Sequence, residues 1–258
     1  MDPRGEHAPE AYEALCRLEA SAFALLPDEL LDRARRQSPD DVVGRFSEQF
    51  VVDVTQVDVA PLAAEIGDLV GPFVSALWVL DMGGRTDAAV ARLFGIDVPA
   101  RKGEVVDYAV AFDELLTIVA RLSTLDPVTT ELVRLRGARF HNCRICQSLR
   151  TASALSAGGS EDLYDQIDRY ESSDMSEAQK VALRLTDAIV TSPALIDSAL
   201  AGQAHRHYSD AQLVELAFDI MRNAANKVAV AFGADEARIS EGWELYDVLP
   251  TGEVVYDL

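Results

Sequence analysis

Cysteine is scarce in this chain, with three in 258 residues: Cys16, Cys143 and Cys146. So small and uneven a set excludes the disulfide scaffold of a small secreted protein. Residues 1–10 are polar and lack the apolar run of a signal peptide, and no run of about 18 uncharged apolar residues occurs. We therefore expect a cytoplasmic protein with no membrane partner.

Basic residues are also few compared with acidic ones. Lys and Arg total 23 against 43 Asp and Glu, which leaves a formal net charge of −20. The arginines at 33–36 and 134–139 are interleaved with apolar residues at helical spacing, so they are typical of solvated helix faces rather than of a basic patch. A phosphate backbone would be repelled, and we expect no nucleic-acid partner.

Apolar residues make up 49% of the chain and recur mostly at helical spacing, which predicts an all-α fold with a sizeable core. Helix starts are marked by Asp126-Pro127 and by capping-box patterns at 176–179 and 209–212. Segments 181–190 and 213–232 are more apolar than one buried face requires, which predicts a homo-oligomer.

The pattern divides the chain into four parts. Residues 1–95 form an N-terminal helical region, 96–106 a linker, 107–240 a second helical domain and 241–258 a tail, in which alternation over 244–256 predicts a small β-hairpin. Phe94-Gly95 aligns on Phe232-Gly233, and the same alignment pairs Asp81 with Asp219. A degenerate duplication and two unrelated helices with similar ends explain this likeness equally well.

The chemistry is concentrated around Cys143 and Cys146. We expect Asn142 to cap a helix from residue 143 to about 155, which would place the CxxC at a helix N-terminus, where the thiolate is favoured. Arg150 would then lie one turn beyond Cys146 on the same face, with Arg144 also within about a turn. Two cysteines at this spacing can close a disulfide.

The CxxC has two other interpretations: a pair of inert core cysteines, or half of a zinc site. A zinc site would need two more ligands, and the candidates His205 and His207 lie far along the chain with no second CxxC. We therefore expect neither a metal nor another cofactor.

The segment from Glu131 to Arg150 resembles the signature of the alkyl hydroperoxidase D-like, or carboxymuconolactone decarboxylase, superfamily. That signature is a Glu, eleven residues, Cys-x-x-Cys, three residues and His. Glu131, Cys143 and Cys146 stand at the required spacing, whereas Arg150 occupies the position of the His. The looser likeness extends over residues 107–235 and includes Asn223-Ala-Ala-Asn226-Lys.

The resemblance implies an all-α oligomer whose cysteine pair reduces a hydroperoxide. Cys146 would be oxidised to a sulfenic acid, Cys143 would resolve it as a disulfide, and a dithiol protein or small thiol would reduce the pair. Glu131 would serve in the proton relay, the alternative being a solvated carboxylate paired with Arg134 or Arg136.

Arg150 cannot shuttle a proton as His does, but it could hold Cys146 as a thiolate. His141 could supply the missing imidazole, although we favour a turn residue there. The departure from the signature leaves other activities open: another thiol-disulfide reaction, a non-redox lyase of the decarboxylase type, or a non-catalytic helical oligomer.

Overall fold

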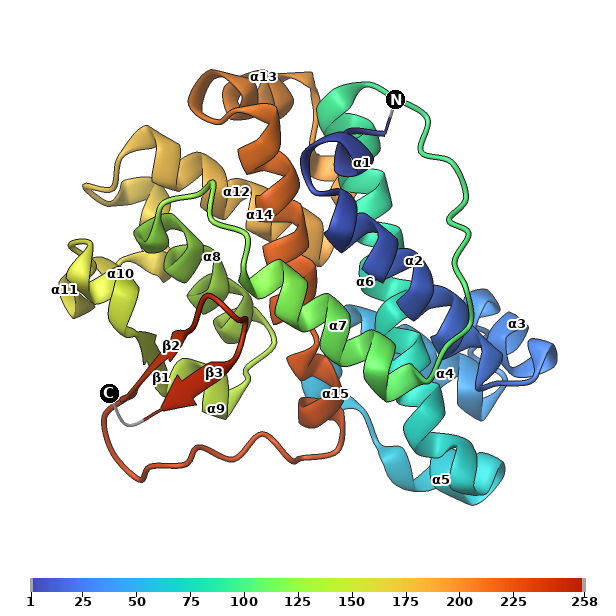
Figure 1. Ribbon diagram of the computed structural model, residues 1–258. Helices are drawn as coiled ribbons and strands as arrows, with labels where there is room; N and C mark the ends of the chain where they lie inside the picture. The colour runs from blue at the N-terminus through green and yellow to red at the C-terminus, as the bar shows by residue number, and fades with distance from the viewer. Residues whose placement is uncertain (1, 257–258) are drawn as a thin grey trace.

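α-Helices account for nearly all regular structure in residues 2–256, the part of the chain that the computed structural model describes (Figure 1). Up to residue 94 the helical elements are α1 (Pro3–His7), α2 (Pro9–Ala24), α3 (Asp28–Arg36), α4 (Val42–Val52), η1 (Val54–Gln56), α5 (Val59–Ile66), η2 (Gly67–Leu69) and α6 (Val70–Phe94). From residue 108 they are α7 (Tyr108–Ala120), α8 (Pro127–Phe140), α9 (Arg144–Gln147), α10 (Ala152–Ser156), α11 (Glu161–Tyr164), η3 (Ile167–Ser172), α12 (Glu177–Thr191), η4 (Pro193–Leu195), α13 (Ser198–His207), α14 (Asp210–Asn223) and α15 (Asn226–Ala231). The all-α prediction is confirmed.

Helix boundaries follow the local signals in the sequence. The Asp126 carboxylate accepts the backbone N–H of Thr129 at 2.9 Å, with Pro127 in the first helical position of α8. Both capping boxes form, in front of α12 and α14. Gly95 ends α6 in the left-handed conformation that glycine adopts without a Cβ penalty.

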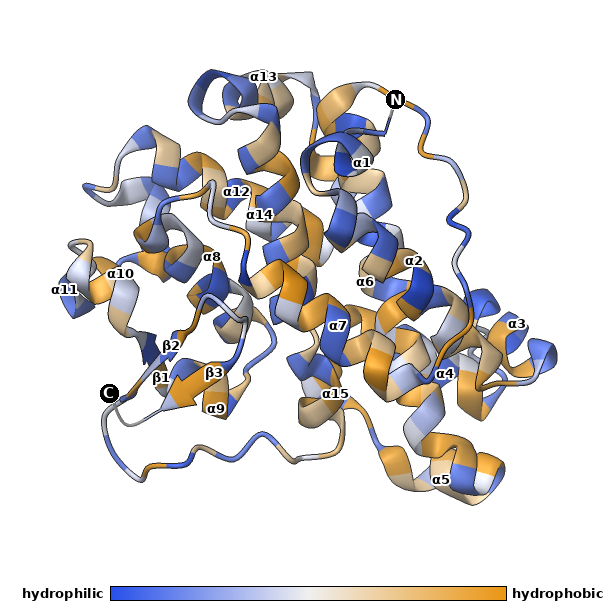
Figure 2. Ribbon diagram, in the orientation of Figure 1, coloured by the Kyte–Doolittle hydropathy of each residue, from blue (hydrophilic) through white to orange (hydrophobic). Residues whose placement is uncertain are grey.

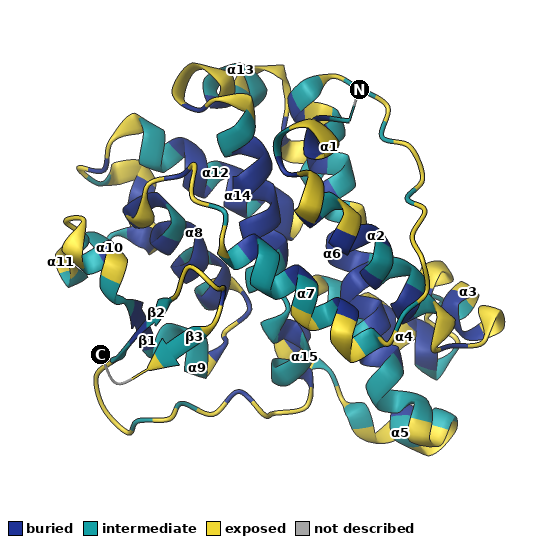
Figure 3. Ribbon diagram, in the orientation of Figure 1, coloured by how far each residue is buried: buried dark blue, intermediate teal, exposed yellow. Residues whose placement is uncertain are grey.

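The centre of the molecule is formed by α6 and α14, which pack side by side and bury apolar side chains between the surrounding helices (Figures 2 and 3). One hydrophobic cluster draws on helices from both sides of residues 96–106, including Trp78 of α6 and Phe218 of α14. Residues 96–106 run as an extended segment along the outside of α2 to α7 (Figure 1). A smaller cluster lies under α8 and includes Leu132 and Tyr164.

One helical stretch among residues 2–256, Val59–Phe94, is long and apolar enough to cross a membrane by length and composition alone. Its central side chains, including Phe73, Leu77 and Trp78, are buried against other helices of the same chain. Packing within the protein therefore accounts for these central apolar side chains.

The element order α4–η1–α5–α6 recurs as α12–η4–α13–α14/α15. Gly233, like Gly95, adopts a positive φ just after the last helix. The packing is reciprocal, because η4 contacts α6 and η1 contacts α15. This is the arrangement that a duplicated helical unit with exchanged contacts would produce.

The expected helix from 143 to 155 is wrong. Cys143, not Asn142, is the N-cap, and α9 ends at Gln147 after a single turn. The chain then forms strand β1 (Leu149–Thr151), which pairs in parallel with β2 (Glu244–Val248). The pairing begins where the Glu244 N–H donates to the Ser148 carbonyl at 2.8 Å. A partner nearly 100 residues away therefore overrides the local helical pattern.

The predicted C-terminal hairpin is present as β2 and the antiparallel β3 (Val254–Tyr256). Residues 257–258 of the expected tail lie outside the described part. With β1, the hairpin makes a three-stranded sheet in the order β1-β2-β3. The segment that follows the two cysteines is therefore an edge strand of this sheet.

Candidate functional site

Cys143 and Cys146 form a disulfide at the end of α8, with their Cα atoms 5.3 Å apart. Cys143 is fully buried, whereas Cys146 is partly exposed. Cys16 is a buried free thiol on α2. If the pair is opened and closed by an external reagent, Cys146 is therefore the sulfur that the reagent can reach.

The turn that carries the two cysteines, residues 143–147 (the cysteine turn), is held by hydrogen bonds from α8 and from the segment after α15. The Cys143 N–H donates to the Ala138 carbonyl at 2.9 Å, which continues α8 into the turn. The N–H of Arg144 donates to the Asp235 carboxylate at 2.9 Å, and its guanidinium pairs with the same side chain at 2.8 Å. This pairing with Arg144 lowers the pKa of Asp235. Residues after α15 therefore hold the turn, and Arg144 is engaged with a carboxylate.

Asn226, the first residue of α15, donates its side-chain N–H to the Cys146 sulfur at 3.1 Å. In the sequence, Asn226 belongs only to the looser likeness over residues 107–235 and is not predicted at the site. The contact joins segments 80 residues apart, so no local pattern could reveal it.

His141 lies at the C-terminal cap of α8 and is 3% exposed. Burial, together with the positive charges of Lys227 and Arg85, lowers its pKa to about 3, against an opposing contribution from Asn226. The ring is therefore neutral at physiological pH, and its Nδ1 is buried with no hydrogen-bond partner among the described residues. His141 is thus both a turn residue and a neighbour of Asn226.

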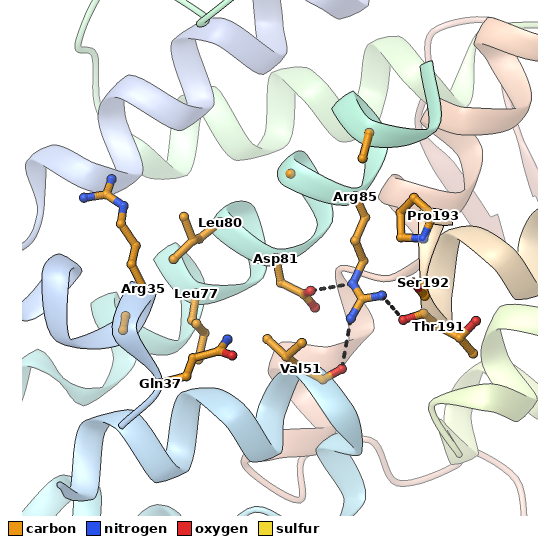
Figure 4. A pocket seen from close by; sticks show the side chains of 13 residues that line it. Arg35, Gln37, Val51, Leu77, Leu80, Asp81, Arg85, Thr191, Ser192 and Pro193 are labelled. Atoms are coloured by element: carbon orange, nitrogen blue, oxygen red, sulfur yellow. Dashed lines mark hydrogen bonds and ion pairs between the residues drawn. The ribbon is translucent and has the colours of Figure 1, made fainter. Parts of the chain in front are cut away.

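The cations near His141 belong to a cluster that joins the two halves of the chain. Lys227 Nζ contacts Asp81 Oδ2 at 2.6 Å and lies 4.4 Å from the centre of the Phe50 ring. The other Asp81 oxygen accepts from Arg85, whose guanidinium also donates to the Thr191 and Val51 carbonyls (Figure 4).

The opening in Figure 4 has a volume of about 420 Å³. The Arg85 guanidinium lies in its wall with all three nitrogens bonded within the protein. This arrangement links α6 with the last turns of α4 and α12, and we assign it a structural role.

Glu131 lies on α8 and is 1% exposed. Its carboxylate forms a bidentate pair with Arg134 at 2.7 and 2.8 Å and accepts the Thr151 N–H at 3.3 Å. Arg134 also donates to the carbonyls of Cys146 and Leu149, each at 2.7 Å, and the nearby carboxylate raises its pKa. Glu131 is therefore paired with Arg134, as one of the two predictions had it, but it is buried and not solvated. Its link to Cys146 is indirect, through the hydrogen bond that Arg134 donates to the Cys146 carbonyl.

Arg150 is not where the sequence placed it. Because α9 ends at Gln147, Arg150 lies on β1, and its guanidinium pairs with Glu161 at 2.8 and 2.9 Å. It also donates to the Gln147 and Leu149 carbonyls and lies 5.6 Å from the centre of the Tyr164 ring. The expectation of a shared helix face with Cys146 is wrong, and the arginine's charge is compensated by Glu161.

A separate cavity of about 280 Å³ is lined on one side by Glu131 and Arg134 and on another by residues 246–248 of β2. Asp219 of α14 lines it, with one carboxyl oxygen buried and unpartnered among the described residues. Burial and the nearby Glu215 raise the pKa of Asp219 to about 8, against a smaller opposing effect of Arg222. This wall of the cavity therefore holds a neutral carboxylic acid at neutral pH.

No group of three His, Cys, Asp or Glu side chains in residues 2–256 could hold a metal ion. No family model matches the chain, and no solved structure matches it. Two proteins of Mycobacterium tuberculosis, named Uncharacterized protein MT2376 (strain CDC 1551) and Uncharacterized protein Rv2313c (strain H37Rv), are each 40% identical to it over 249 residues. These matches cover 92% of this chain and 88% of each relative.

The chain belongs to the family of these mycobacterial proteins. Uncharacterized protein YdfG of Bacillus subtilis is 26% identical over 114 residues, which cover 78% of that protein and 43% of this chain. A protein shorter than this chain therefore aligns, over most of its length, with less than half of it.

Proposed function

We propose that this protein is a thiol-dependent peroxidase in which Cys146 reacts with the peroxide and Cys143 resolves the product. The observation that carries the proposal is the disulfide itself, closed within one turn by one buried and one accessible sulfur. The resemblance of residues 131–146 to the alkyl hydroperoxidase D-like signature supports the same assignment.

In the proposed reaction, the Cys146 thiolate attacks one oxygen of a hydroperoxide and the O–O bond breaks. The alkoxide leaves, takes up a proton and departs as the alcohol, while the sulfur becomes a sulfenic acid. The Cys143 thiol then attacks that sulfur, water leaves, and the disulfide forms. An external dithiol reduces the disulfide by exchange and is itself oxidised.

Glu131 acts in this scheme through Arg134. The arginine donates to the Cys146 carbonyl while its charge is balanced by Glu131, so the pair orients the reactive turn. Direct proton transfer by Glu131 would require the carboxylate to leave Arg134. We therefore assign Glu131 and Arg134 a positioning role.

The proposal places the protein in the cytoplasm, where reductants of the thioredoxin or small-thiol type can return the pair to the thiol state. It also includes a homo-oligomer, since apolar side chains such as Val52, Val110 and Leu195 are 61–65% exposed in the isolated chain. A sedimentation measurement at micromolar concentration tests this part, and a monomer would contradict it.

The deciding experiment is a thiol count on reduced protein before and after one equivalent of cumene hydroperoxide. We expect the Cys16→Ala variant to lose two thiols and to regain them with a dithiol. Cys146→Ser should lose none. Cys143→Ser should accumulate a sulfenic acid on Cys146, which dimedone traps.

Three results would separate the alternatives. Thiol loss with a disulfide substrate but not with peroxide would favour another thiol-disulfide reaction. No loss with either would reject redox function and leave the lyase or the non-catalytic module. Dimedone labelling at Cys143 instead of Cys146 would reverse the assigned roles.

A further inference from the structure

The Cys146 sulfur has one side-chain hydrogen-bond donor within the described residues, the Asn226 amide at 3.1 Å. A thiolate accepts a hydrogen bond more strongly than a thiol or a disulfide sulfur, because it carries the full negative charge. A donor that remains at this position after reduction therefore stabilises the charged form of Cys146. That stabilisation lowers the pKa of the thiol.

The position of Asn226 is built into the backbone. Helix α14 ends at Asn223 and α15 begins at Asn226, so a break between the two helices directs the new helix start toward the cysteine turn. The next residue, Lys227, is 2% exposed and is held by Asp81 and the Phe50 ring. The N-terminal half of the chain thereby anchors the residue beside Asn226.

The charged side chains around the turn have partners of opposite charge. On α8 Glu131 pairs with Arg134, on α9 Arg144 pairs with Asp235, and on β1 Arg150 pairs with Glu161. On α15 Lys227 shares the carboxylate of Asp81 with Arg85, which leaves one positive charge in excess there, while His141 is neutral. None of these cations donates a hydrogen bond to the Cys146 sulfur, which accepts from the Asn226 amide. Asn226 therefore stands at the sulfur where Arg150 was expected.

We propose that Asn226 is a positioning residue that holds the Cys146 sulfur and stabilises its thiolate. The inference deepens the proposed function, since that thiolate is the nucleophile there. The thiolate equilibrium itself is measurable whether or not peroxide is the substrate. The two proposals can therefore fail separately.

The test is the pH dependence of Cys146 alkylation by iodoacetamide, in a Cys16→Ala, Cys143→Ala background where Cys146 is the remaining thiol. Asn226→Asp removes the donor and places a carboxylate against the sulfur. We expect the pH midpoint to rise by at least one unit, a tenfold or greater loss of thiolate at fixed pH below the midpoint. Asn226→Ala, which removes the donor alone, should shift the midpoint in the same direction by less.

The matched control is Asn223→Asp, which adds the same charge three residues earlier, at the end of α14, whereas the hydrogen bond to the sulfur comes from Asn226. We expect it to shift the midpoint by less than a third as much. Far-ultraviolet circular dichroism establishes that each variant folds. Equal shifts for the two aspartates, or a midpoint unchanged in both Asn226 variants, would overturn the inference.

The outcomes also separate this inference from the proposed function. If Asn226→Asp shifts the midpoint while the native protein loses no thiols to peroxide, the peroxidase proposal fails and Asn226 keeps its role. If peroxide oxidises the pair but the midpoint does not respond to Asn226, the peroxidase proposal stands and this inference is wrong.

Discussion

Replacing Asp219 by asparagine should make the protein more stable, and increasingly so as the pH rises. Asp219 lies in the middle of α14, 5% exposed, with one oxygen unpartnered among the described residues. Glu215, one turn earlier, is held by the N–H and hydroxyl of Thr124 and by the N–H of Leu125. Burial of Asp219 and the nearby Glu215 both oppose ionisation of Asp219.

The sign of the pH effect follows from proton binding. The ordinary pKa of an aspartate is 3.8, and in the folded protein the pKa of Asp219 is raised to about 8. Between these values the folded state holds a proton that the unfolded chain has released, so the free energy of unfolding decreases as pH rises from about 4 to 8. A rise of this size corresponds to roughly 5 kcal/mol over the whole interval.

Asparagine has the same shape and keeps a donor, but it does not titrate. The difference in unfolding free energy between Asp219→Asn and the parent should therefore grow by several kcal/mol, of order 3, between pH 5 and pH 8. Urea denaturation at pH 5, 6.5, 8 and 9 measures it. Asp174→Asn, at an exposed position, is the matched control and should show no such trend. A pH-independent difference for Asp219→Asn would show that Asp219 is ionised in the folded protein and refute the reasoning.

Arg150→Met should destabilise the fold by about 2–4 kcal/mol, because it removes the hydrogen bonds of a buried guanidinium to the Gln147 and Leu149 carbonyls and to Glu161, yet leave the alkylation midpoint of Cys146 unchanged; a shifted midpoint would restore the role predicted from the sequence. Lys227→Met should cost about 1–3 kcal/mol in urea denaturation, since Asp81 loses one of its two hydrogen-bonded cations inside the core but keeps Arg85, and no measurable cost would count against that pairing. Gly103→Ala should lower the thermal midpoint, because a Cβ there would overlap the backbone carbonyl of Cys16; unchanged melting would contradict this contact.

Asp81 and Asp219 show how one aligned position can serve two purposes. Asp81 is paired with Lys227 and Arg85, whereas Asp219 lacks a partner for one oxygen among the described residues and lines a cavity. The sequence alignment paired the two aspartates but could not distinguish their surroundings, because the cations at Asp81 come partly from the other half of the chain.

Features that depend on neighbours along the chain could be predicted from the residues alone. The period of apolar residues predicts the helices, and Asp126-Pro127 and the two capping boxes predict where three of them begin. The alternation over 244–256 predicts the hairpin. The CxxC spacing allows the disulfide, since a single turn brings the two sulfurs together. Each of these rests on interactions within a few residues, whose energies the local sequence specifies.

The surroundings of Cys146 follow from long-range packing and could not be predicted from the residues nearby in the chain. Strand β1 replaces the expected helix because its backbone pairs with β2, and that change moves Arg150 to Glu161. Asn226 reaches the sulfur from a helix start 80 residues away, and Glu131 is buried under Arg134 instead of being solvated. These placements depend on long-range packing and on pairing of buried charges, which leave no periodic or local trace in the sequence.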